Sequence, residues 1–565
     1  MYLVAHLVSR FSPTLILLLL VAATHLPFIF QAFHIDDRIY LEVAENALSK
    51  PFFPYDYLPV FEGMGASDAA SHSHLPLTSY YLALVMAVTG SQSEWVYHLS
   101  FLVFPILAGF GFYDLARRYT RFPLAATCLL LLAPAFLVLS HTLMSDVPFW
   151  ALWILTLSRF LRIRDRSANR WDWLVCALSL VAASFVSLLT VGLILLMGAH
   201  LLLERNSSRI SWHWALILAL PLLVWFLWYF RAYLHYDRFV LASTALHMAK
   251  RAAFSWDGLA QRILSFILNL GGTFLFPLTL WWAFAGRISV RVFIWVFFLC
   301  FVPFYLWWDN WSWTHICLFS VLFASGLSVV WAFIRQTVYP LSSENRASWI
   351  LLSLWFWGAL AICLVLYYSG SVRYAALALP PTILLWMAKL EDRFRSQYLL
   401  RNLLWLSIGL TAVYSLTVAH ADYQFANVYR QTSQAIAQRY AQTGRTIWYT
   451  GEWGFRYYMN ANGARILRRI GNEPKPGDII VKPYLATPWV TLFDSDEYLD
   501  LLEQRKAQMA GPIRILDFAS HAGFYSSGWG ILPFSLSSGE PWEWFNIFQV
   551  KKAYTGPIPE PETHW

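Results

Sequence analysis

Long apolar runs recur along the first 420 residues of this 565-residue chain, and they constrain its fold more than any other feature. A helix needs about 20 apolar residues to cross the hydrocarbon core of a bilayer. About thirteen runs in the sequence are long enough to cross it, or nearly so. They lie at roughly 13–32, 97–115, 123–141, 147–161, 172–188, 190–203, 212–230, 263–285, 290–307, 314–334, 349–368, 374–390 and 401–419. The sequence therefore predicts a polytopic α-helical membrane protein.

The composition agrees with a chain that folds in lipid. Charged residues make up only 13% of the sequence, against about 25% in a soluble domain. The first run, from Pro13 to Ala32, is long for a signal peptide and has no clear small-x-small cleavage site, so we expect an uncleaved first span. The five cysteines lie in or beside apolar runs and form no CxxC signature, so they predict no metal site.

Basic residues gather in alternate connections between the runs. By the positive-inside rule these connections are cytoplasmic. Their basic residues are Arg117, Arg118, Arg121, Arg162, Arg164, Arg166, Arg170, Arg205, Arg209, Arg287, Arg291, Arg335, Arg346, Lys389, Arg393, Arg395 and Arg401. We expect a protein of a bacterial inner (plasma) membrane with a cytoplasmic N-terminus, and an odd number of spans then places everything after His420 outside. The net charge of +8 is explained by this placement and predicts no nucleic-acid partner.

Two regions do not read as membrane. The first outer loop, 34–95, is too long to be a simple connector, and long loops are usually functional. Within it, Leu77 to Val88 predicts a short helix that begins after Pro76 and lies at the membrane interface. We therefore divide the chain into a transmembrane domain, 1–419, whose loop 34–95 carries the active site, and an extracytoplasmic domain, 420–565.

The C-terminal region reads as a small α/β domain. A helix is expected from Tyr423 to Tyr440. Short β-like runs separated by Gly and Pro turns follow it. They lie at Thr446–Tyr449, Asp478–Lys482, Ile513–Asp517 and Phe545–Val550.

The candidate chemistry lies at the outer ends of the apolar runs. Asp36 and Asp37 are adjacent carboxylates directly after the first run, suited to accept a proton or to hold a metal ion, although an ordinary solvated loop start explains them equally well. Asp146 stands in a tight turn between the third and fourth runs, where a helix N-cap is the alternative role. Arg373, near the outer end of the twelfth run, could bind a lipid-linked phosphate or simply extend to lipid headgroups.

These residues occur in an order that resembles the GT-C superfamily of membrane glycosyltransferases. The order is an acidic pair after the first span, His74-Leu-Pro-Leu77 before a short helix, Asp146 between spans three and four, and Arg373-Tyr374 followed by Pro380-Pro381. The branch that is most similar contains the protein O-mannosyltransferases and the aminoarabinose transferases. The resemblance covers roughly residues 10–390, and the family's usual His-Pro-Pro-Leu is His-Leu-Pro-Leu here.

The resemblance implies an inverting glycosyltransferase that moves a sugar from a polyprenyl-phosphate donor to an acceptor hydroxyl at the outer face. It implies catalytic roles for Asp36, Asp37 and Asp146. It implies donor-phosphate contacts for Arg38, Arg373, Tyr374 and His74. The acceptor would be a lipid, a glycan or a protein. No resident cofactor is implied with certainty, and a divalent cation stays open.

Two other functions remain as alternatives. A transporter or lipid flippase would also be polytopic, but it favours charged or broken helices near the bilayer midplane and two similar halves. The candidate acids of this chain cluster at the outer boundary instead. A third alternative is a non-catalytic scaffold whose C-terminal domain is the working part. Convergence of Asp36, Asp146 and Arg373 on one outer-facing cavity would favour the glycosyltransferase.

Overall fold

The computed structural model of the chain is mostly helical, with strands confined to its C-terminal part. It describes residues 12–57, 75–165, 168–203, 212–242, 255–274, 294–295, 297–299, 301–302, 311–339, 346–367, 369–441, 443–468, 471, 473–486, 495–508, 511–537 and 539–554.

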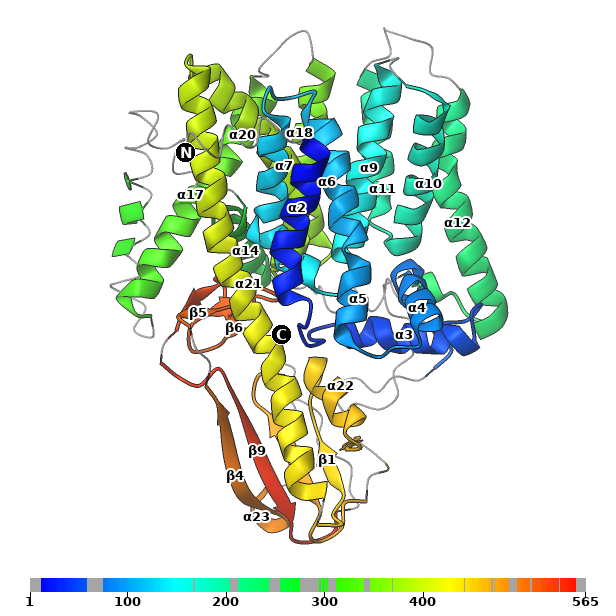
Figure 1. The fold of residues 1–565 in the computed structure, drawn as a ribbon, viewed down its shortest axis with the longest axis vertical. Helices are drawn as coiled ribbons and strands as arrows, with labels where there is room; N and C mark the ends of the chain where they lie inside the picture. Colours follow the sequence, from blue (N-terminus) through cyan, green and yellow to red (C-terminus); the bar gives the residue numbers. More distant parts are fainter. Residues whose placement is uncertain are drawn as a thin grey trace.

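Most helices of the first part run side by side as a bundle, whereas α3 (Asp37–Ser49) lies across one end of it (Figure 1). α3 packs against α4 (Leu77–Thr89), the short helix expected after Pro76. The remaining helices and 3-10 turns are α2 (Pro13–His25), η1 (Leu26–Phe28), α5 (Glu94–Phe101), α6 (Val103–Ala116), α7 (Pro123–Leu132), α8 (Pro134–Leu137), η3 (Leu139–His141), α9 (Asp146–Arg164), α10 (Arg170–Val186), α11 (Thr190–Leu203), α12 (Trp212–Tyr236), α14 (Trp256–Thr273), α17 (Trp313–Val338), α18 (Arg346–Val365), α19 (Val372–Ala375), η4 (Ala376–Ala378), α20 (Leu379–Arg393) and α21 (Gln397–Ala441).

Several of these helices can cross a membrane. Among the described residues, five are long and apolar enough, with α5 and α6 taken together, and a bent pair from Pro123 to His141 would make a sixth. The mostly helical membrane architecture is therefore confirmed. The count of about thirteen spans stays a prediction, and the run at 290–307 lies largely outside the described residues.

The third apolar run is broken by a proline. α7 and the helical turns after it are bent by 58°. Ala133, directly before Pro134, has φ −57° and ψ 132°, the extended conformation that a following proline favours. Residues 139–145 follow the bend and lead directly to Asp146. Within them, Leu143 donates its N–H to Asp37.

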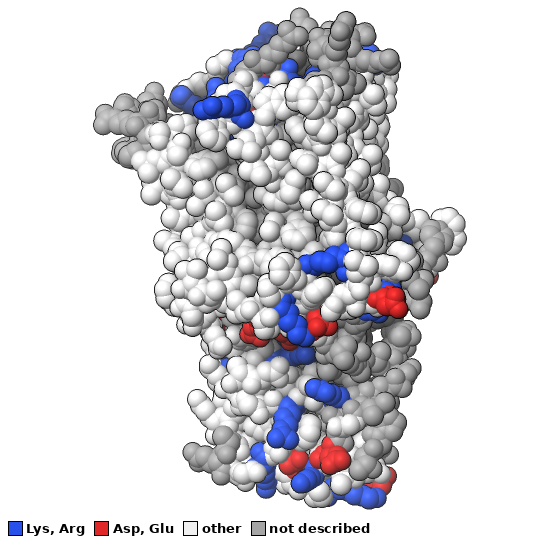
Figure 2. All heavy atoms as spheres, turned by 90° about the vertical axis from the view of Figure 1, so that its right-hand side faces the viewer, with Lys and Arg blue, Asp and Glu red and all other residues white. Residues whose placement is uncertain are grey.

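Charge is distributed in zones along the molecule. Figure 2 shows a broad band of the visible face without charged side chains. Lys and Arg lie at one end of this band, and both signs of charge lie toward the C-terminal domain. An apolar band of this kind suits a bilayer, because charged side chains are costly in hydrocarbon.

The longest helix, α21, joins the bundle to the C-terminal domain (Figure 1). Its 45 residues make it roughly 68 Å long at 1.5 Å per residue. That is about twice the hydrocarbon thickness, so one end of the helix extends beyond a membrane. The domain boundary expected at 419/420 falls within this helix, and the division into domains stays a prediction.

The C-terminal domain contains a five-stranded mixed sheet in the order β2-β1-β3-β9-β4. β1 is parallel to both of its neighbours, and β9 is antiparallel to β3 and β4. The elements are β1 (Ile447–Tyr449), α22 (Trp453–Ala461), β2 (Arg465–Ile466), β3 (Ile479–Pro483), α23 (Ser495–Tyr498), β4 (Leu499–Ala507), β5 (Ile513–Arg514), β6 (Leu516–Asp517), β7 (Ala522–Gly523), β8 (Ser535–Leu536) and β9 (Glu543–Val550).

A buried carboxylate attaches this sheet to α21. Tyr429 of α21 donates a hydrogen bond of 2.9 Å to Glu543 of β9. Glu543 also accepts from the backbone N–H groups of Tyr484 and Leu485. The strand-containing C-terminal domain that the sequence predicted is confirmed.

Candidate active site

Asp36, Asp146 and Arg373 meet in one cluster, although they come from three distant parts of the sequence. Arg373 donates from Nη1 to Asp36 Oδ2 at 2.6 Å and from Nε to Asp146 Oδ2 at 3.0 Å. The side chain of Arg373 is 9% exposed, that of Asp146 14% and that of Asp36 27%. Two carboxylates and one guanidinium leave the cluster with a net negative charge, and Asp36 is its most accessible member.

A strained turn presents Asp36. Ile35 has φ 49°, a left-handed conformation that is rare for a β-branched residue. Asp36 is the N-cap residue of α3, and its carbonyl oxygen accepts the N–H of Ile39 at 2.9 Å. Such a backbone costs about 1–3 kcal/mol and persists only where its surroundings hold it in place.

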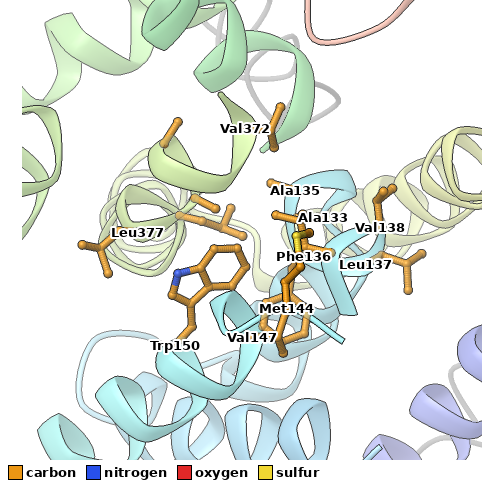
Figure 3. Close-up of a cluster of buried hydrophobic side chains, with 14 of the residues drawn as sticks. Ala133, Ala135, Phe136, Leu137, Val138, Met144, Val147, Trp150, Val372 and Leu377 are labelled. Atoms are coloured by element: carbon orange, nitrogen blue, oxygen red, sulfur yellow. The ribbon is translucent and has the colours of Figure 1, made fainter. Parts of the chain in front are cut away.

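The other two members are held by packing. Asp146 is the first residue of α9, and Arg373 lies in α19, whose N-cap residue Ser371 accepts the Arg373 N–H through its side chain. Apolar residues close in sequence to Asp146 and to Arg373 pack in one cluster with the segment around the Pro134 bend (Figure 3). Its labelled members are Ala133, Ala135, Phe136, Leu137, Val138, Met144, Val147, Trp150, Val372 and Leu377. This cluster fixes the distance between the α9 and α19 backbones.

Asp37 is enclosed rather than presented. Its carboxylate is fully buried and accepts the backbone N–H of His34 at 3.1 Å and that of Leu143 at 2.8 Å. The Leu143 bond connects the start of α3 to the turn before Asp146. The geometry gives Asp37 a structural task in holding this turn.

Arg38 takes part in a second charged cluster. Its guanidinium is buried and donates to Glu42 at 2.6 Å and to Glu452 at 2.7 Å. Arg456 of α22 joins the same carboxylates, at 3.1 Å from Glu452 and 3.6 Å from Glu42. The structure thus joins Arg38 to the C-terminal domain and not to the pair of acids around Arg373.

Tyr374 and His74 are the other two residues that the sequence places at the site. Tyr374 stacks on Tyr367 with ring centroids 3.4 Å apart, next to Arg373 in the chain. His74 lies outside the described residues.

A buried polar network lies behind Asp36, and the sequence analysis missed most of it. Asp422 of α21 accepts hydrogen bonds from Tyr525 at 2.8 Å and from Gln31 at 3.0 Å. His34 Nε2 lies 3.1 Å from the same Asp422 oxygen and 3.2 Å from the Tyr525 hydroxyl. Burial alone would lower the pKa of His34, but the carboxylates of Asp422 and Asp37 outweigh it and raise the pKa to about 10. The sequence signal for Asp422 was weak, because this acid lies just beyond the apolar run at 401–419.

An aromatic cavity lies beside the site. It holds about 20 Å³, roughly the space of one water molecule, between the 53–55 segment and the end of α12, and its lining includes Phe53, Tyr55 and Trp228. The guanidinium of Arg231 lies over the rings of Phe53 and Trp228, at 4.9 and 4.4 Å from their centroids. Asn46 of α3 donates to the carbonyl oxygen of Pro54 at 2.8 Å, and the hydroxyl of Tyr40 in the same helix is 2.8 Å from Ser145, directly before Asp146 in the chain.

No group of three or more His, Cys, Asp or Glu side chains that could hold a metal ion is found in the part of the chain that the structure describes. At the candidate site, the positive charge between the two carboxylates is the guanidinium of Arg373. A divalent cation bound there would have to share or replace that position.

Comparison with known proteins supports the resemblance to membrane glycosyltransferases that the sequence indicated. Residues 72–229 match the model of the Dolichyl-phosphate-mannose-protein mannosyltransferase family. This match confirms the resemblance to the GT-C membrane glycosyltransferases, and it includes Asp146 but neither Asp36 nor Arg373. No curated protein sequence matches the chain.

Solved structures also match the chain, at low sequence identity. ArnT from Cupriavidus metallidurans bound to undecaprenyl phosphate is 15% identical, with a TM-score of 0.41, over 85% of this chain and 95% of that one. The Archaeoglobus fulgidus oligosaccharyltransferase tethered to an acceptor peptide is 13% identical, with a TM-score of 0.48, over 81% of this chain and 64% of that one.

Proposed function

We propose that this protein is an inverting glycosyltransferase that transfers a sugar from a polyprenyl-phosphate donor to an acceptor hydroxyl at the outer face of the membrane. The observation that carries the proposal is the position of Arg373 between Asp36 and Asp146. A transferase of this kind needs a carboxylate for the incoming hydroxyl and a cation for the leaving phosphate within reach of one substrate.

In the proposed reaction Asp36 is the general base. The acceptor oxygen attacks the anomeric carbon of the sugar from the face opposite the phosphate, while its proton passes to Asp36. The bond between the anomeric carbon and the phosphate oxygen breaks, and the electron pair leaves with the polyprenyl phosphate. Attack from the opposite face inverts the anomeric configuration.

Arg373 is the residue that we assign to the leaving phosphate. Its guanidinium already bridges two carboxylates, and a guanidinium binds a phosphate well in two-point contact. Asp146 keeps Arg373 oriented while the phosphate contacts its other N–H groups. Tyr374 and His74 are proposed to support the donor. Because Arg38 is engaged by Glu42 and Glu452, a phosphate contact from Arg38 would require it to leave one of them.

The aromatic cavity is too small to enclose a sugar ring, so we propose that a sugar packs against the partly exposed rings of Phe53, Tyr55 and Trp228 that line it. Aromatic faces pack well against the apolar faces of sugars, and Arg231 adds a charge that attracts phosphate. The acceptor remains a lipid, a glycan or a protein, and the location remains a bacterial inner membrane with the N-terminus in the cytoplasm.

The test is a transfer assay with the purified full-length protein in lipid. The protein is offered a panel of radiolabelled polyprenyl-phosphate sugars, with and without a chelator, and sugar transfer and donor hydrolysis are both scored. We expect turnover of at least one donor by the wild type and a rate about 10²–10⁴-fold lower in Asp36→Asn. If no donor is turned over, or if Asp36→Asn is as active as the wild type, this function is wrong.

The same panel tests the alternative of a transporter or flippase. A flippase would move a labelled polyprenyl lipid across a vesicle membrane without breaking the bond between sugar and phosphate. Asp36, which pairs with Arg373, is the N-cap residue of α3, the helix that lies across one end of the bundle (Figure 1). That position favours chemistry on a headgroup over passage through the bilayer midplane.

A further inference from the structure

One short segment of the C-terminal domain, Gly523–Ser527, contacts both stretches of chain that carry the candidate site. The segment begins in β7. One stretch is 369–372, directly before Arg373, and the other contains His34, two residues before Asp36.

The contacts on the Arg373 side are made largely by the backbone. Val372 donates its N–H to the carbonyl oxygen of Phe524 at 3.0 Å, and Ser527 donates its N–H to the carbonyl oxygen of Gly370 at 2.7 Å. Gly370 in turn donates its N–H to Ser527 Oγ at 2.9 Å. A side chain at Gly370 would begin 2.1 Å from Ser265 Oγ, so only glycine fits this close approach.

The contact on the Asp36 side is made by a tyrosine hydroxyl. Tyr525 donates to Asp422 at 2.8 Å, and its oxygen lies 3.2 Å from His34 Nε2. All three side chains are buried, so water cannot replace a lost bond without rearrangement.

A second part of the same domain supports this side. The first turn of α22 approaches the chain at Phe33 so closely that a Cβ on Gly454 would lie 2.0 Å from the Phe33 carbonyl oxygen. Tyr458, also in α22, accepts the backbone N–H of Phe33 with its hydroxyl oxygen at 2.9 Å. These contacts lie on the residues just before the strained Ile35.

We propose that the Gly523–Ser527 segment positions the two halves of the candidate centre relative to each other, with Tyr525 acting on Asp36 through His34 and with Phe524 and Ser527 acting on Arg373 through the 370–372 backbone. Tyr525, Asp422 and Ser527 are thus positioning residues. The left-handed turn at Ile35 would return to an ordinary conformation once its supports are removed. Because the C-terminal domain supplies these supports, it takes part in positioning Asp36.

The kinetic test rests on the proposed function and uses the full-length protein in lipid with a polyprenyl-phosphate sugar that it turns over. Tyr525→Phe keeps the ring and removes only the hydroxyl. We expect kcat to fall by up to about 10²-fold, the size of effect that small misplacements of catalytic groups produce. The KM for the donor should stay unchanged, because Arg373 keeps its backbone anchors. Ser527→Ala should lower kcat and raise the donor KM together.

Matched controls come from the same domain. Tyr498→Phe alters a tyrosine that packs on Tyr554, and Ser537→Ala alters a serine whose hydroxyl oxygen accepts the backbone N–H of Gly539. Both should retain wild-type kinetics. Unchanged kcat in Tyr525→Phe would overturn the proposal, as would a loss of kcat that only mirrors a lower melting temperature. A double variant separates a positioning effect from a general loss of stability. The kcat of Tyr525→Phe/His34→Gln should be no lower than the kcat of His34→Gln alone, since both changes remove the same contact.

A second measurement does not depend on any activity. Amide hydrogen exchange is compared in peptides covering residues 34–40 and 370–376 in wild type, Tyr525→Phe and Ser527→Ala. Exchange should accelerate in 34–40 for Tyr525→Phe and in 370–376 for Ser527→Ala, with both Tyr498→Phe and Ser537→Ala unchanged. If the wild type turns over no donor, the proposed function fails, while this exchange pattern still decides the positioning role. Unaltered exchange in both variants would refute that role.

Discussion

The two adjacent acids of the first outer loop differ in their surroundings more than in their chemistry. Asp36 is partly exposed beside Arg373, whereas Asp37 is enclosed and bound to two backbone N–H groups. Adjacent residues at the start of a helix point in different directions, so only one of the two can face a substrate. Their conservative variants should therefore fail in different ways.

We predict that Asp36→Asn removes activity and leaves the fold intact, whereas Asp37→Asn weakens the fold. Loss of a general base should lower transfer about 10²–10⁴-fold. At Asp37 the amide of asparagine would turn an N–H group toward a backbone N–H, which costs about 1–3 kcal/mol when buried. Transfer rates and melting temperatures of the two purified variants check this. The opposite pattern would exchange the roles assigned to the two acids.

His34 gives a prediction about pH. Its pKa is raised from 6.5 to about 10 by Asp422 and Asp37, which outweigh the opposing effect of burial. A pKa that is higher in the folded state means that the folded protein holds a proton that the unfolded chain has released. The resulting stabilisation is fully present below pH 6.5 and is lost as the pH rises through about 10.

The measurement is the melting temperature of the protein in detergent between pH 6 and 10. We expect it to fall across this range in the wild type and to fall less in Asp422→Asn, where the main partner of His34 is neutral. Asp500→Asn is the control, because Asp500 pairs with Lys551 at the surface. Equal slopes in wild type and Asp422→Asn would contradict the assigned protonation of His34.

At the scale of elements, the sequence predicted the long apolar helices well and the polar ones less well. The runs at 190–203 and 314–334 correspond to α11 and α17 within a few residues. Apolar runs longer than a strand leave few alternatives to a helix. α3 was not identified, because the mixture of charged and apolar residues from Asp37 to Ser49 has no long apolar run.

The strand β4 was missed for a related reason. Its sequence, Leu-Asp-Leu-Leu-Glu-Gln-Arg-Lys-Ala, is largely charged and does not alternate cleanly. β4 is an edge strand, paired only with β9 within its sheet, and edge strands often carry charges that discourage pairing with other chains. The sequence lacks a clean alternation because no side chain of β4 other than Leu499 is buried, and because the register shifts between Leu501 and Glu503.

The site was predictable where residues sit at the ends of apolar runs. Asp36, Asp146 and Arg373 were expected to converge, and the structure brings them together. Asp422, Glu452 and Tyr525 could not be placed in the same way, since their contacts depend on how the C-terminal domain folds back against the bundle.

The buried ion cluster between α3 and α22 predicts a loss of stability when one of its members is neutralised. Glu452 is buried between Arg38 and Arg456, and removal of one partner from a buried ion pair leaves an uncompensated charge. Glu452→Gln should lower the free energy of unfolding by about 3–5 kcal/mol, toward the lower end because both arginines keep Glu42. The control is Glu503→Gln, whose partner Arg439 is 58% exposed, and about 0–1 kcal/mol is expected there.

Denaturant titration of the two variants in detergent, followed by tryptophan fluorescence, measures this difference. Faster amide exchange of α3 in Glu452→Gln would show in addition that loss of the ion pair destabilises the helix that follows Asp36. Equal stability of Glu452→Gln and Glu503→Gln would mean that the buried cluster contributes no more than a surface pair.

The whole molecule is organised around α21, which starts beside the last basic connection of the bundle and ends in the C-terminal domain (Figure 1). A rigid helix of this length carries Asp422 at the level of the first outer loop and Tyr429 at the level of the sheet. The candidate site then lies between bundle and domain. This arrangement requires the site and the domain to be on the same side of the membrane.

We therefore predict that α21 crosses the membrane and that the two ends of the crossing face opposite sides. The connection around Lys389 to Arg401 is basic and should be cytoplasmic by the positive-inside rule. The helix is roughly twice as long as the hydrocarbon core is thick, so its second half should stand clear of the membrane on the outside. Reporter fusions after Lys389 and after Gly444, a turn residue with φ 67° beyond the helix, should report the cytoplasm and the outside, respectively. A fusion after Arg164, in another basic connection, serves as the cytoplasmic control. If the fusions after Lys389 and Gly444 report the same side, α21 does not cross, and a site braced by the C-terminal domain could not face the outer surface.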